Sequence, residues 1–299
     1  MQEAVVVHEV GLRDGLQNQP RHVHTEGKRA ILNALIEAGV SSIEATSFVS
    51  PKAVPQMADA AEFYSSLPLS SSINYEALVP NERGYERALA AGAKTVALVL
   101  ASTETMNQKN INMSFKKALK VNIEVIARAK AEGVRARSYI STALHCPYEG
   151  NVEPSIIYEI AKQVHDAGAN EIVIADTTGG GNPAQVKSIF TNLANTYGTD
   201  ILAAHFHDTR GMGLALAWVA LECGVRKFDS SIGGLGGCPF APGATGNLAT
   251  EDLVFMLNQS GYDTGINIDK LRTAIKVAQS YVDQPLGGKI THWLDSQKN

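Results

Sequence analysis

Cysteine is scarce in this sequence: the 299 residues include only Cys146, Cys223 and Cys238. An odd, sparse set of cysteines does not form the disulfide framework of small secreted proteins. The N-terminus also lacks a basic segment followed by an apolar core and a cleavage site, the pattern of a secretory signal. We therefore expect a reduced, soluble, cytoplasmic protein.

Long apolar runs and an excess of basic charge are missing as well. No apolar stretch approaches the ~20 residues of a membrane span, so we expect no membrane segment. The net charge of −4 and the absence of a basic run argue against nucleic acid as the main partner. The apolar share of 44% is enough for a substantial core, and no linker divides the chain. We expect a single catalytic domain over residues 1–299, with a barrel at about 4–262 and a C-terminal helical extension at about 263–299.

The sequence does contain a repeated unit in which an amphipathic helix ends in glycine and a short strand follows. Glycine suits the left-handed position that ends a helix, and it occurs there at Gly39, Gly92, Gly133, Gly168, Gly198 and Gly224. With two further apolar runs, the chain has eight predicted strands, at residues 4–10, 41–44, 74–79, 95–99, 134–140, 172–175, 201–204 and 225–232. Eight such units favour a (β/α)8 TIM barrel. A doubly wound sheet is the alternative, but Gly11–Gly15 is not the phosphate loop it would normally carry. Asn81 and Ser114 are predicted N-caps, and residues 268–284 are predicted to form an additional helix.

In a TIM barrel the chemistry lies at the C-terminal ends of the strands. Polar and ionisable residues follow the predicted strands at that end: Arg13, Asp14, Glu44, Ser47, Tyr139, Ser141, Asp176, Thr177, His205, His207, and then Cys238 and Asn247. Each has a structural explanation when taken alone. Arg13 and Asp14 could form a turn, Glu44 could be a paired core acid, Asn247 a helix N-cap and Cys238 a small buried residue. Their coincidence at one face of one barrel favours function.

The spacing of His205 and His207 indicates a metal site. Side chains two residues apart on a strand point to the same side. With oxygen from Asp14 and Asn247, and no thiolate required, the set favours Mg²⁺ or Mn²⁺ over structural zinc. Such a metal is a Lewis acid, and Arg13 beside it could stabilise an oxyanion. The glycines around Cys238 would let that thiol approach a bound substrate.

Several segments resemble the 3-hydroxy-3-methylglutaryl-CoA lyase family, a group of metal-dependent lyases and synthases on a TIM barrel. They are residues 9–18 (EVGLRDGLQN), 47–52 (SFVSPK), 146–150 (CPYEG), 205–209 (HFHDT) and 234–239 (GLGGCP). The resemblance covers about residues 5–270. It implies an acyl-CoA substrate and cleavage of 3-hydroxy-3-methylglutaryl-CoA, or a close 3-hydroxy-3-alkyl analogue, to acetyl-CoA and acetoacetate or the corresponding 3-oxo acid. We also expect a homo-oligomer.

The resemblance assigns roles to individual residues. Asp14, His205, His207 and Asn247 match metal ligands, Arg13 matches the residue that stabilises the enolate, Glu44 matches a catalytic acid and Cys238 matches a residue of proton transfer. We expect substrate contacts from Arg13, Gln17, Ser47, Tyr139, Ser141, Asp176 and Thr177. The base that takes the substrate hydroxyl proton could be Asp14 or His205.

The chain departs from the family pattern at two positions that bear on the substrate. The family usually has Trp where this chain has Ala53, and Asn where it has Leu216. We therefore expect a pocket that is less strict about the alkyl group at C3 of the substrate.

Two alternatives remain open. The first is a related Claisen-type condensing enzyme, although such relatives generally carry a further C-terminal domain. The second is a catalytically silent barrel that acts as a binding protein, which the intact Arg13, Asp14, His205, His207 and Cys238 argue against.

Overall fold

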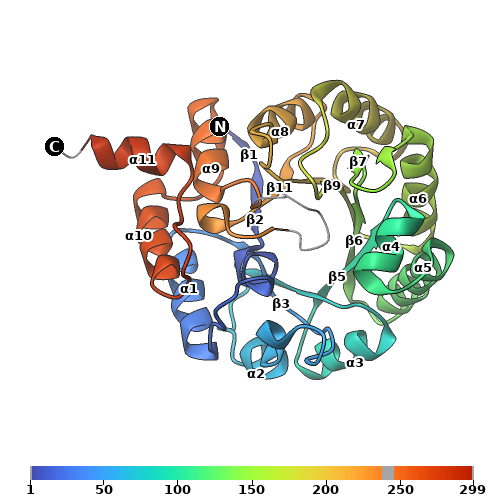
Figure 1. Cartoon of the computed structure of the whole chain (residues 1–299), viewed down its shortest axis with the longest axis horizontal. Helices are drawn as coiled ribbons and strands as arrows, with labels where there is room; N and C mark the ends of the chain where they lie inside the picture. Colours follow the sequence, from blue (N-terminus) through green and yellow to red (C-terminus); the bar gives the residue numbers. More distant parts are fainter. Residues whose placement is uncertain (1, 238–245, 298–299) are drawn as a thin grey trace.

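Eight parallel strands close into a barrel at the centre of the molecule (Figure 1). The structure is a computed structural model that describes residues 2–237 and 246–297. In order around the barrel the strands are β2 (Val6–Glu9), β3 (Ser42–Ser47), β4 (Asn74–Leu78), β5 (Thr95–Ala101), β6 (Arg135–Ser141), β9 (Glu171–Asp176), β10 (Leu202–Phe206) and β11 (Lys227–Ser230). β11 pairs with β2 and closes the ring. The predicted (β/α)8 barrel is confirmed.

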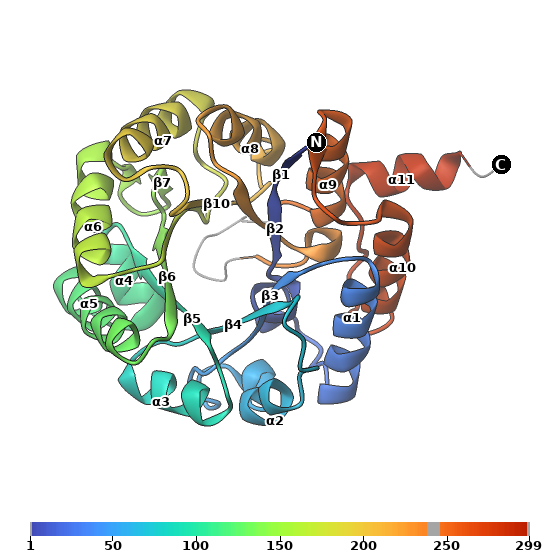
Figure 2. The same ribbon diagram turned by 180° about the vertical axis from the view of Figure 1, so that it is seen from behind.

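Helices surround the barrel in a ring (Figure 2). In chain order they are α1 (Thr25–Glu37), α2 (Ala60–Ser65), α3 (Glu82–Ala90), α4 (Glu104–Ile111), α5 (Phe115–Ala131), α6 (Pro154–Ala167), α7 (Pro183–Tyr197), α8 (Gly213–Glu222), α9 (Thr250–Gln259), α10 (Ile268–Gln279) and α11 (Lys289–Ser296). α10 packs against α1 and α9, so it joins the two ends of the ring. α11 packs against α9 and extends outward from the barrel (Figure 1).

The helix boundaries follow the predicted local signals. All six glycines expected to end a helix have positive φ, for example Gly168 at 105° and Gly224 at 94°. Asn81 Oδ1 accepts the backbone N–H of Gly84 at 3.0 Å, and Ser114 Oγ accepts that of Lys117 at 3.3 Å. Both predicted N-caps are therefore confirmed.

The C-terminal extension differs from the single helix predicted at residues 268–284. α10 ends at Gln279, and α11 follows after a turn. The side chain of Gln279 holds this turn, because its Nε2 donates to the carbonyl of Gln284 and its Oε1 accepts the N–H of Leu286. Pro285 has no N–H and disfavours helical backbone at the residue before it. The additional C-terminal helix is thus confirmed, but it is shorter than predicted and has a successor.

The first predicted strand, residues 4–10, divides in two. β1 (Glu3–Ala4) pairs with β12 (Tyr262–Asp263) outside the barrel, and only β2 enters it. The remaining short elements are the hairpin of β7 (His145–Cys146) with β8 (Gly150–Asn151), the one-turn π-helix η1 (Gly11–Gly15), and the 3₁₀ turns η2 (Pro55–Met57) and η3 (Ile232–Gly234).

Alternation along the strands separates two packed regions. Side chains such as Val96, Leu98 and Ile140 face the helices and belong to the main hydrophobic core. A smaller cluster faces the barrel interior: Leu78, Ala97, Tyr139, Val173, Ala175 and Ala203. The interior also contains buried charged groups, among them Glu76, Arg137 and Asp229.

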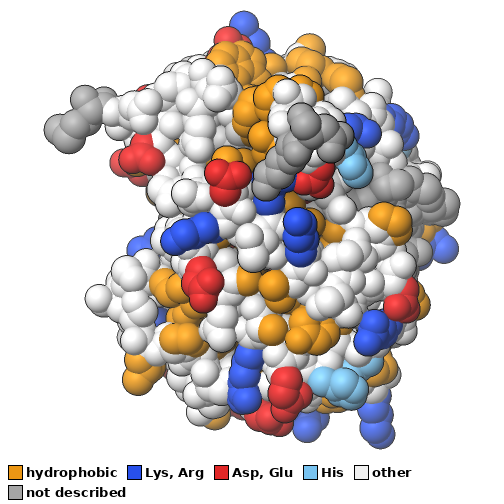
Figure 3. Space-filling model, turned by 90° about the vertical axis from the view of Figure 1, so that its left-hand side faces the viewer, with side chains coloured by type: hydrophobic (Ala, Val, Ile, Leu, Met, Phe, Trp, Pro, Cys, Tyr) orange, Lys and Arg blue, Asp and Glu red, His pale blue; other side chains and the backbone are white. Residues whose placement is uncertain are grey.

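The surface is mixed in charge on the face shown in Figure 3, where Lys and Arg side chains are interspersed with Asp and Glu. Within the described ranges, no helix has both the length and the hydropathy of a membrane span.

Candidate active site

η1 places Arg13 and Asp14 at the C-terminal end of the barrel, directly after β2. Glu9 at the end of β2 anchors this turn, because its Oε1 accepts the backbone N–H groups of Gly11 at 2.8 Å and Ile232 at 2.9 Å. A Cβ at Gly11 would lie 2.6 Å from Glu9 Oε1, so the anchored turn requires glycine there. Thr250 donates to Glu9 Oε2 at 2.6 Å. A buried carboxylate thus connects η1, η3 and the start of α9.

Arg13 is held by carboxylates on two sides. Its Nε donates to Glu44 Oε2 and its Nη1 to Asp14 Oδ1, both at 2.6 Å. Burial raises the pKa of Glu44 to about 7, against the opposing charge of Arg13. Burial also disfavours the Arg13 cation, but Glu44 and Asp14 outweigh it and raise the pKa of Arg13. Arg13 is therefore a fixed positive charge, and Glu44 positions it.

Asp14, His205 and His207 form a cluster with the geometry of a metal site. Each offers one ligand atom, and these atoms lie within 4.8 Å of one another. His205 belongs to β10 and His207 follows it, with ring centroids 5.3 Å apart. Burial acts to raise the pKa of Asp14, but Arg13 and the two imidazoles hold it below its ordinary value. The two-residue spacing thus brings the histidines together at Asp14, as predicted.

Asn247 contacts this cluster through its side chain. Its Nδ2 donates to Asp14 Oδ2 at 2.8 Å and to the carbonyl of Leu235 at 3.0 Å. Its Oδ1 is buried and has no hydrogen-bond partner among the described residues. The N-cap of α9 is Ala249, so the alternative interpretation of Asn247 as the helix N-cap is wrong. Two imidazoles, a carboxylate and an unpaired amide oxygen are a donor set that fits a divalent cation such as Mn²⁺ or Mg²⁺.

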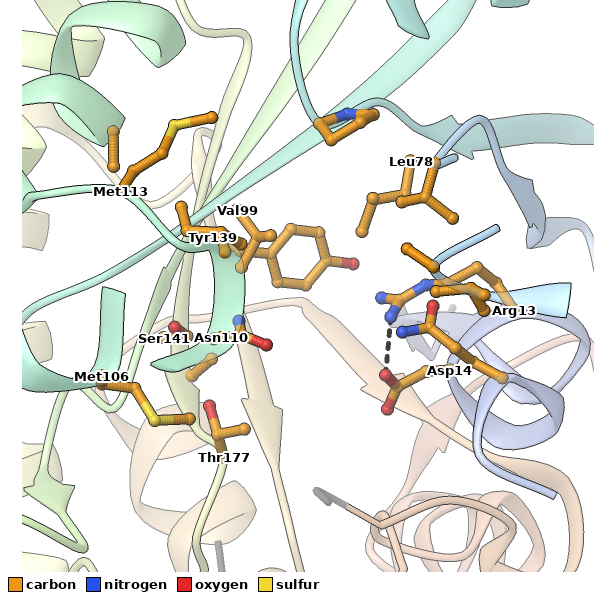
Figure 4. A pocket seen from close by; sticks show the side chains of 18 of the residues that line it. Arg13, Asp14, Leu78, Val99, Met106, Asn110, Met113, Tyr139, Ser141 and Thr177 are labelled. Carbon is orange, nitrogen blue, oxygen red and sulfur yellow. Dashed lines mark hydrogen bonds and ion pairs between the residues drawn. The ribbon is translucent and has the colours of Figure 1, made fainter. Parts of the chain in front are cut away.

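A cavity of about 510 Å³ adjoins the cluster, with Arg13, Asp14, His205 and His207 in its wall. Figure 4 shows Arg13 and Asp14 facing Tyr139 across this space, with Ser141, Thr177 and Asn110 on the far side. Gln17, Tyr139, Ser141 and Thr177 line the cavity, as do Val49, Ala53, Leu78 and Val99, which give it an apolar wall. Four of the predicted substrate-binding residues besides Arg13 therefore border one space.

Other predicted site residues lie elsewhere. Ser47 is fully buried in β3 and is absent from the described lining of the cavity. Asp176 is absent from it too, because its carboxylate accepts the backbone N–H groups of Gly180 at 3.1 Å and Gly181 at 2.8 Å. Asp176 thus organises the loop after β9. Cys238 lies outside the described residues, whereas the preceding Gly237 lines the cavity.

The two departures from the family pattern are placed differently. Ala53 lines the cavity, next to Val54. Leu216 is fully buried in α8 and packs in the main hydrophobic core. The expected influence of Leu216 on the substrate therefore has no basis in the structure. Of the two residues, only Ala53 can contact the alkyl group of a bound substrate.

Two parts of the site were not expected from the sequence. The segment from Met106 to Met113, at α4 and just after it, supplies a wall of the cavity (Figure 4). Asp229 of β11 lies behind His205, with its Oδ2 3.2 Å from His205 Nδ1. Burial acts to raise the pKa of Asp229, but Arg137 and the contact with His205 hold it well below its usual range.

Comparison with known proteins agrees with this geometry. The family model described as HMGL-like matches residues 4–277. The chain belongs to the HMGL-like family. Among its relatives in this family is the mitochondrial hydroxymethylglutaryl-CoA lyase of mouse, which is 47% identical over 270 residues, covering 90% of this chain and 83% of the mouse protein. The sequence resemblance noted above is thereby confirmed.

Solved structures extend the family likeness to three dimensions. The Bacillus subtilis HMG-CoA lyase superposes with a TM-score of 0.94 at 39% identity and covers 98% of each chain. An HMG-CoA lyase from Acinetobacter baumannii, solved in complex with coenzyme A and 3-methylmalate, has a TM-score of 0.92 at 37% identity. It covers 97% of this chain and 94% of its own.

Proposed function

We propose that this protein is a metal-dependent lyase that cleaves 3-hydroxy-3-methylglutaryl-CoA, or a close 3-hydroxy-3-alkyl analogue, to acetyl-CoA and a 3-oxo acid. One observation carries the proposal: Arg13, Asp14, His205 and His207 meet in the wall of a single cavity in a chain of the HMGL-like family. A related lyase binds coenzyme A, which supports an acyl-CoA substrate here.

The donor set favours Mg²⁺ or Mn²⁺, held by Asp14, His205, His207 and Asn247. When bound, the cation would act as a Lewis acid that holds substrate oxygens and lowers the pKa of the substrate hydroxyl. The remaining requirements of the reaction fall to the side chains of this chain.

Carbon–carbon cleavage beside a tertiary alcohol first requires removal of the hydroxyl proton. Asp14 and His205, the two predicted candidates, lie in the cavity wall. Asp14 has carboxylate lone pairs that can accept the proton, whereas His205 has none free when its Nδ1–H faces Asp229 and its Nε2 binds the cation. Asp14 already accepts hydrogen bonds from Arg13 and Asn247, and His205 is hydrogen-bonded through Nδ1 to Asp229. Both candidates are therefore held in place.

The electron pair released by cleavage must then be delocalised into the thioester carbonyl. The guanidinium of Arg13 has five N–H groups. Glu44 and Asp14 accept from its Nε and from one Nη1 hydrogen, so other N–H groups can donate to the thioester oxygen. Glu44 holds the guanidinium plane through Nε. On the sequence alone, we propose Cys238 as the acid that protonates the resulting enolate.

The apolar side of the cavity would receive the alkyl group at C3. Ala53 presents a single methyl group there, beside Val49 and Val54. We propose that this wall accepts groups larger than methyl.

Three further expectations remain predictions from the sequence. These are the single-domain organisation, the homo-oligomer and the cytoplasmic location. The names of the mammalian relatives place those proteins in mitochondria.

The deciding experiment is a coupled assay of acetoacetate release from 3-hydroxy-3-methylglutaryl-CoA, on protein stripped with chelator and then supplied with Mg²⁺ or Mn²⁺. We expect turnover only after the cation is added. Full turnover in the stripped protein would contradict the metal dependence. Substrate binding without cleavage would support the binding protein instead, and synthesis from acetyl-CoA and a 2-oxo acid would support the condensing enzyme.

A further inference from the structure

A network of buried charged side chains crosses the barrel interior beneath the metal cluster. Arg137 of β6 is at its centre: its Nη2 donates to Asp229 Oδ1 at 2.8 Å, its Nη1 donates to both oxygens of Glu76 at 3.2 Å, and its Nε is paired with Glu171. All four side chains are at least 92% buried. Of the three carboxylates, Asp229 is the one bonded to a residue of the cluster.

The two oxygens of Asp229 have different partners. Oδ1 accepts from Arg137, whereas Oδ2 accepts from the Tyr139 hydroxyl at 2.6 Å and lies 3.2 Å from His205 Nδ1. A carboxylate can only accept hydrogen bonds, so His205 must carry a proton on Nδ1 to make this contact. The remaining ring nitrogen, Nε2, then offers a lone pair to the cluster.

We infer that Asp229 is a positioning residue that fixes the Nδ1–H tautomer of His205 and thereby leaves Nε2 as the metal ligand. The inference rests on the proposed function, because it assigns a role toward the metal that the function requires. A carboxylate behind a metal-binding histidine fixes its tautomer and orientation, and removing it typically costs roughly 10–100-fold in metal affinity.

Asp229→Asn tests the inference because the hydrogen bond from Arg137 fixes the orientation of the new amide group. Arg137 can only donate, so the amide oxygen must occupy the place of Oδ1. The amide NH₂ then takes the place of Oδ2 and faces His205 Nδ1 as a donor. His205 must accept there and carry its proton on Nε2, the position needed for the metal. A carboxylate-to-amide change of this kind disables a catalytic histidine by the same exchange of tautomers.

The first measurement is the tautomer of His205 in chelator-treated protein, from long-range ¹H–¹⁵N correlations of the imidazole at pH 8. The His205→Gln variant assigns the signal. We expect Nδ1–H in the unaltered protein and Nε2–H in Asp229→Asn. An Nε2–H tautomer in the unaltered protein overturns the inference, and this result does not depend on whether the variant folds.

The second measurement is Mn²⁺ affinity, from the electron paramagnetic resonance signal of free Mn²⁺. We expect Asp229→Asn to bind roughly 10–100-fold more weakly than the unaltered protein. Glu171→Gln is the matched control, because it also removes a carboxylate partner of Arg137, while Glu171 pairs with Arg137 and Lys227 rather than with His205 among the described residues. Thermal unfolding of both variants separates a loss of stability, expected in each, from a loss of metal affinity, expected only in Asp229→Asn.

The outcomes distinguish the two proposals. If the unaltered protein does not bind Mn²⁺, the proposed metal-dependent function fails, and the metal role of Asp229 fails with it. If the unaltered protein binds Mn²⁺ and Asp229→Asn binds it equally well, only the role of Asp229 is overturned.

Discussion

Glu9 allows a quantitative prediction about stability, because it is a fully buried acid with no cation beside it in the described structure. It accepts hydrogen bonds from Thr250 and from the backbone of Gly11 and Ile232. Burial raises its pKa to about 7, and the nearby Glu251 adds to the shift, while the three hydrogen bonds act against it. The folded protein therefore retains a proton on Glu9 over a pH range in which the unfolded chain has lost it.

The sign and size of the effect follow from this difference. Between pH 4.5, the ordinary pKa of Glu, and about 7, the folded state binds one proton more than the unfolded state. The free energy of unfolding must then fall as pH rises, by ~1.4 kcal/mol per pH unit. The contribution of Glu9 is fully present below about pH 4.5 and is lost above about pH 7. The whole loss is ~3.4 kcal/mol at most.

Glu9→Gln should remove this pH dependence and keep most of the contacts. The amide oxygen can still accept the N–H groups of Gly11 and Ile232, and the amide nitrogen can donate to Thr250 Oγ1. We expect the stability of Glu9→Gln, relative to the unaltered protein, to improve by about 3 kcal/mol between pH 5 and pH 9.

The assay is urea unfolding followed by circular dichroism at several pH values. Glu37→Gln, at an exposed carboxylate of α1, controls for the change in net charge. Parallel stability profiles for Glu9→Gln and the unaltered protein from pH 5 to pH 9 would refute the reasoning, since Glu9 would then titrate alike in both states.

Four further predictions concern the site. His207→Ala should abolish the Mg²⁺-dependent turnover while the thermal unfolding of the barrel changes little, because stability in this fold depends mainly on the opposite face. Glu44→Gln should lower kcat by about 10–100-fold, the value of ~1.5–3 kcal/mol for a hydrogen bond to a charged group, and an unchanged kcat would mean that Arg13 needs no support. Ala53→Trp should reduce kcat/KM for longer 3-alkyl analogues by roughly 10–200-fold relative to the methyl substrate, and an equal loss for both would contradict the assigned wall. Cys238→Ser should lower turnover by ~10²–10⁴-fold in the coupled assay, as expected for loss of a general acid. Cys146→Ser, at a buried thiol beside Thr103, should change turnover little, and similar effects of the two cysteine variants would count against Cys238 as the acid.

The barrel could be predicted from the sequence because its signals are local. A glycine with positive φ ends each of six helices. The strand after it is a short apolar run, which can be recognised without knowing which strands pair with it. The strand ends were less accurate. β5 continues to Ala101 rather than ending at Val99, because Leu100 and Ala101 pair with Ile140 and Ser141 of β6.

The site could be predicted in part for the same reason. His205 and His207 are two residues apart on one strand, so their convergence follows from strand geometry alone. Arg13 and Asp14 directly follow the first barrel strand, and in a TIM barrel the active site lies at the C-terminal ends of the strands. Asp229 and Arg137 could not be found in this way. Each is one of several charged residues in its predicted strand, so the pattern does not single it out. Their contact joins two residues that are 92 positions apart in sequence.

Two of the differences from the expectations have a related cause: the side chain is engaged by a partner other than the one expected. Asp176 was expected to bind substrate, but two N–H groups of the following loop occupy its carboxylate. Asn247 could have capped α9, but it lies before Ala249, the N-cap, and its amide contacts Asp14 instead. Sequence patterns show which hydrogen bonds a residue can make, whereas only the fold shows which partner is present.

The buried acids Glu9 and Glu251 accept backbone N–H groups that would otherwise have no partner. Gly11, Ile232, Gly233 and Gly288 lie in turns where no strand or helix neighbour accepts their N–H groups, and leaving such a group buried and unpaired is costly. Glu9 accepts the first two, and Glu251 accepts those of Gly233 at 3.0 Å and Gly288 at 2.5 Å. The carboxylate of Glu9 thereby joins η1, which carries Arg13 and Asp14, to η3. The carboxylate of Glu251 joins η3 to the C-terminal extension at Gly288. An apolar residue at either position would leave those N–H groups without acceptors, so the geometry of the site depends on acids that take no part in its chemistry.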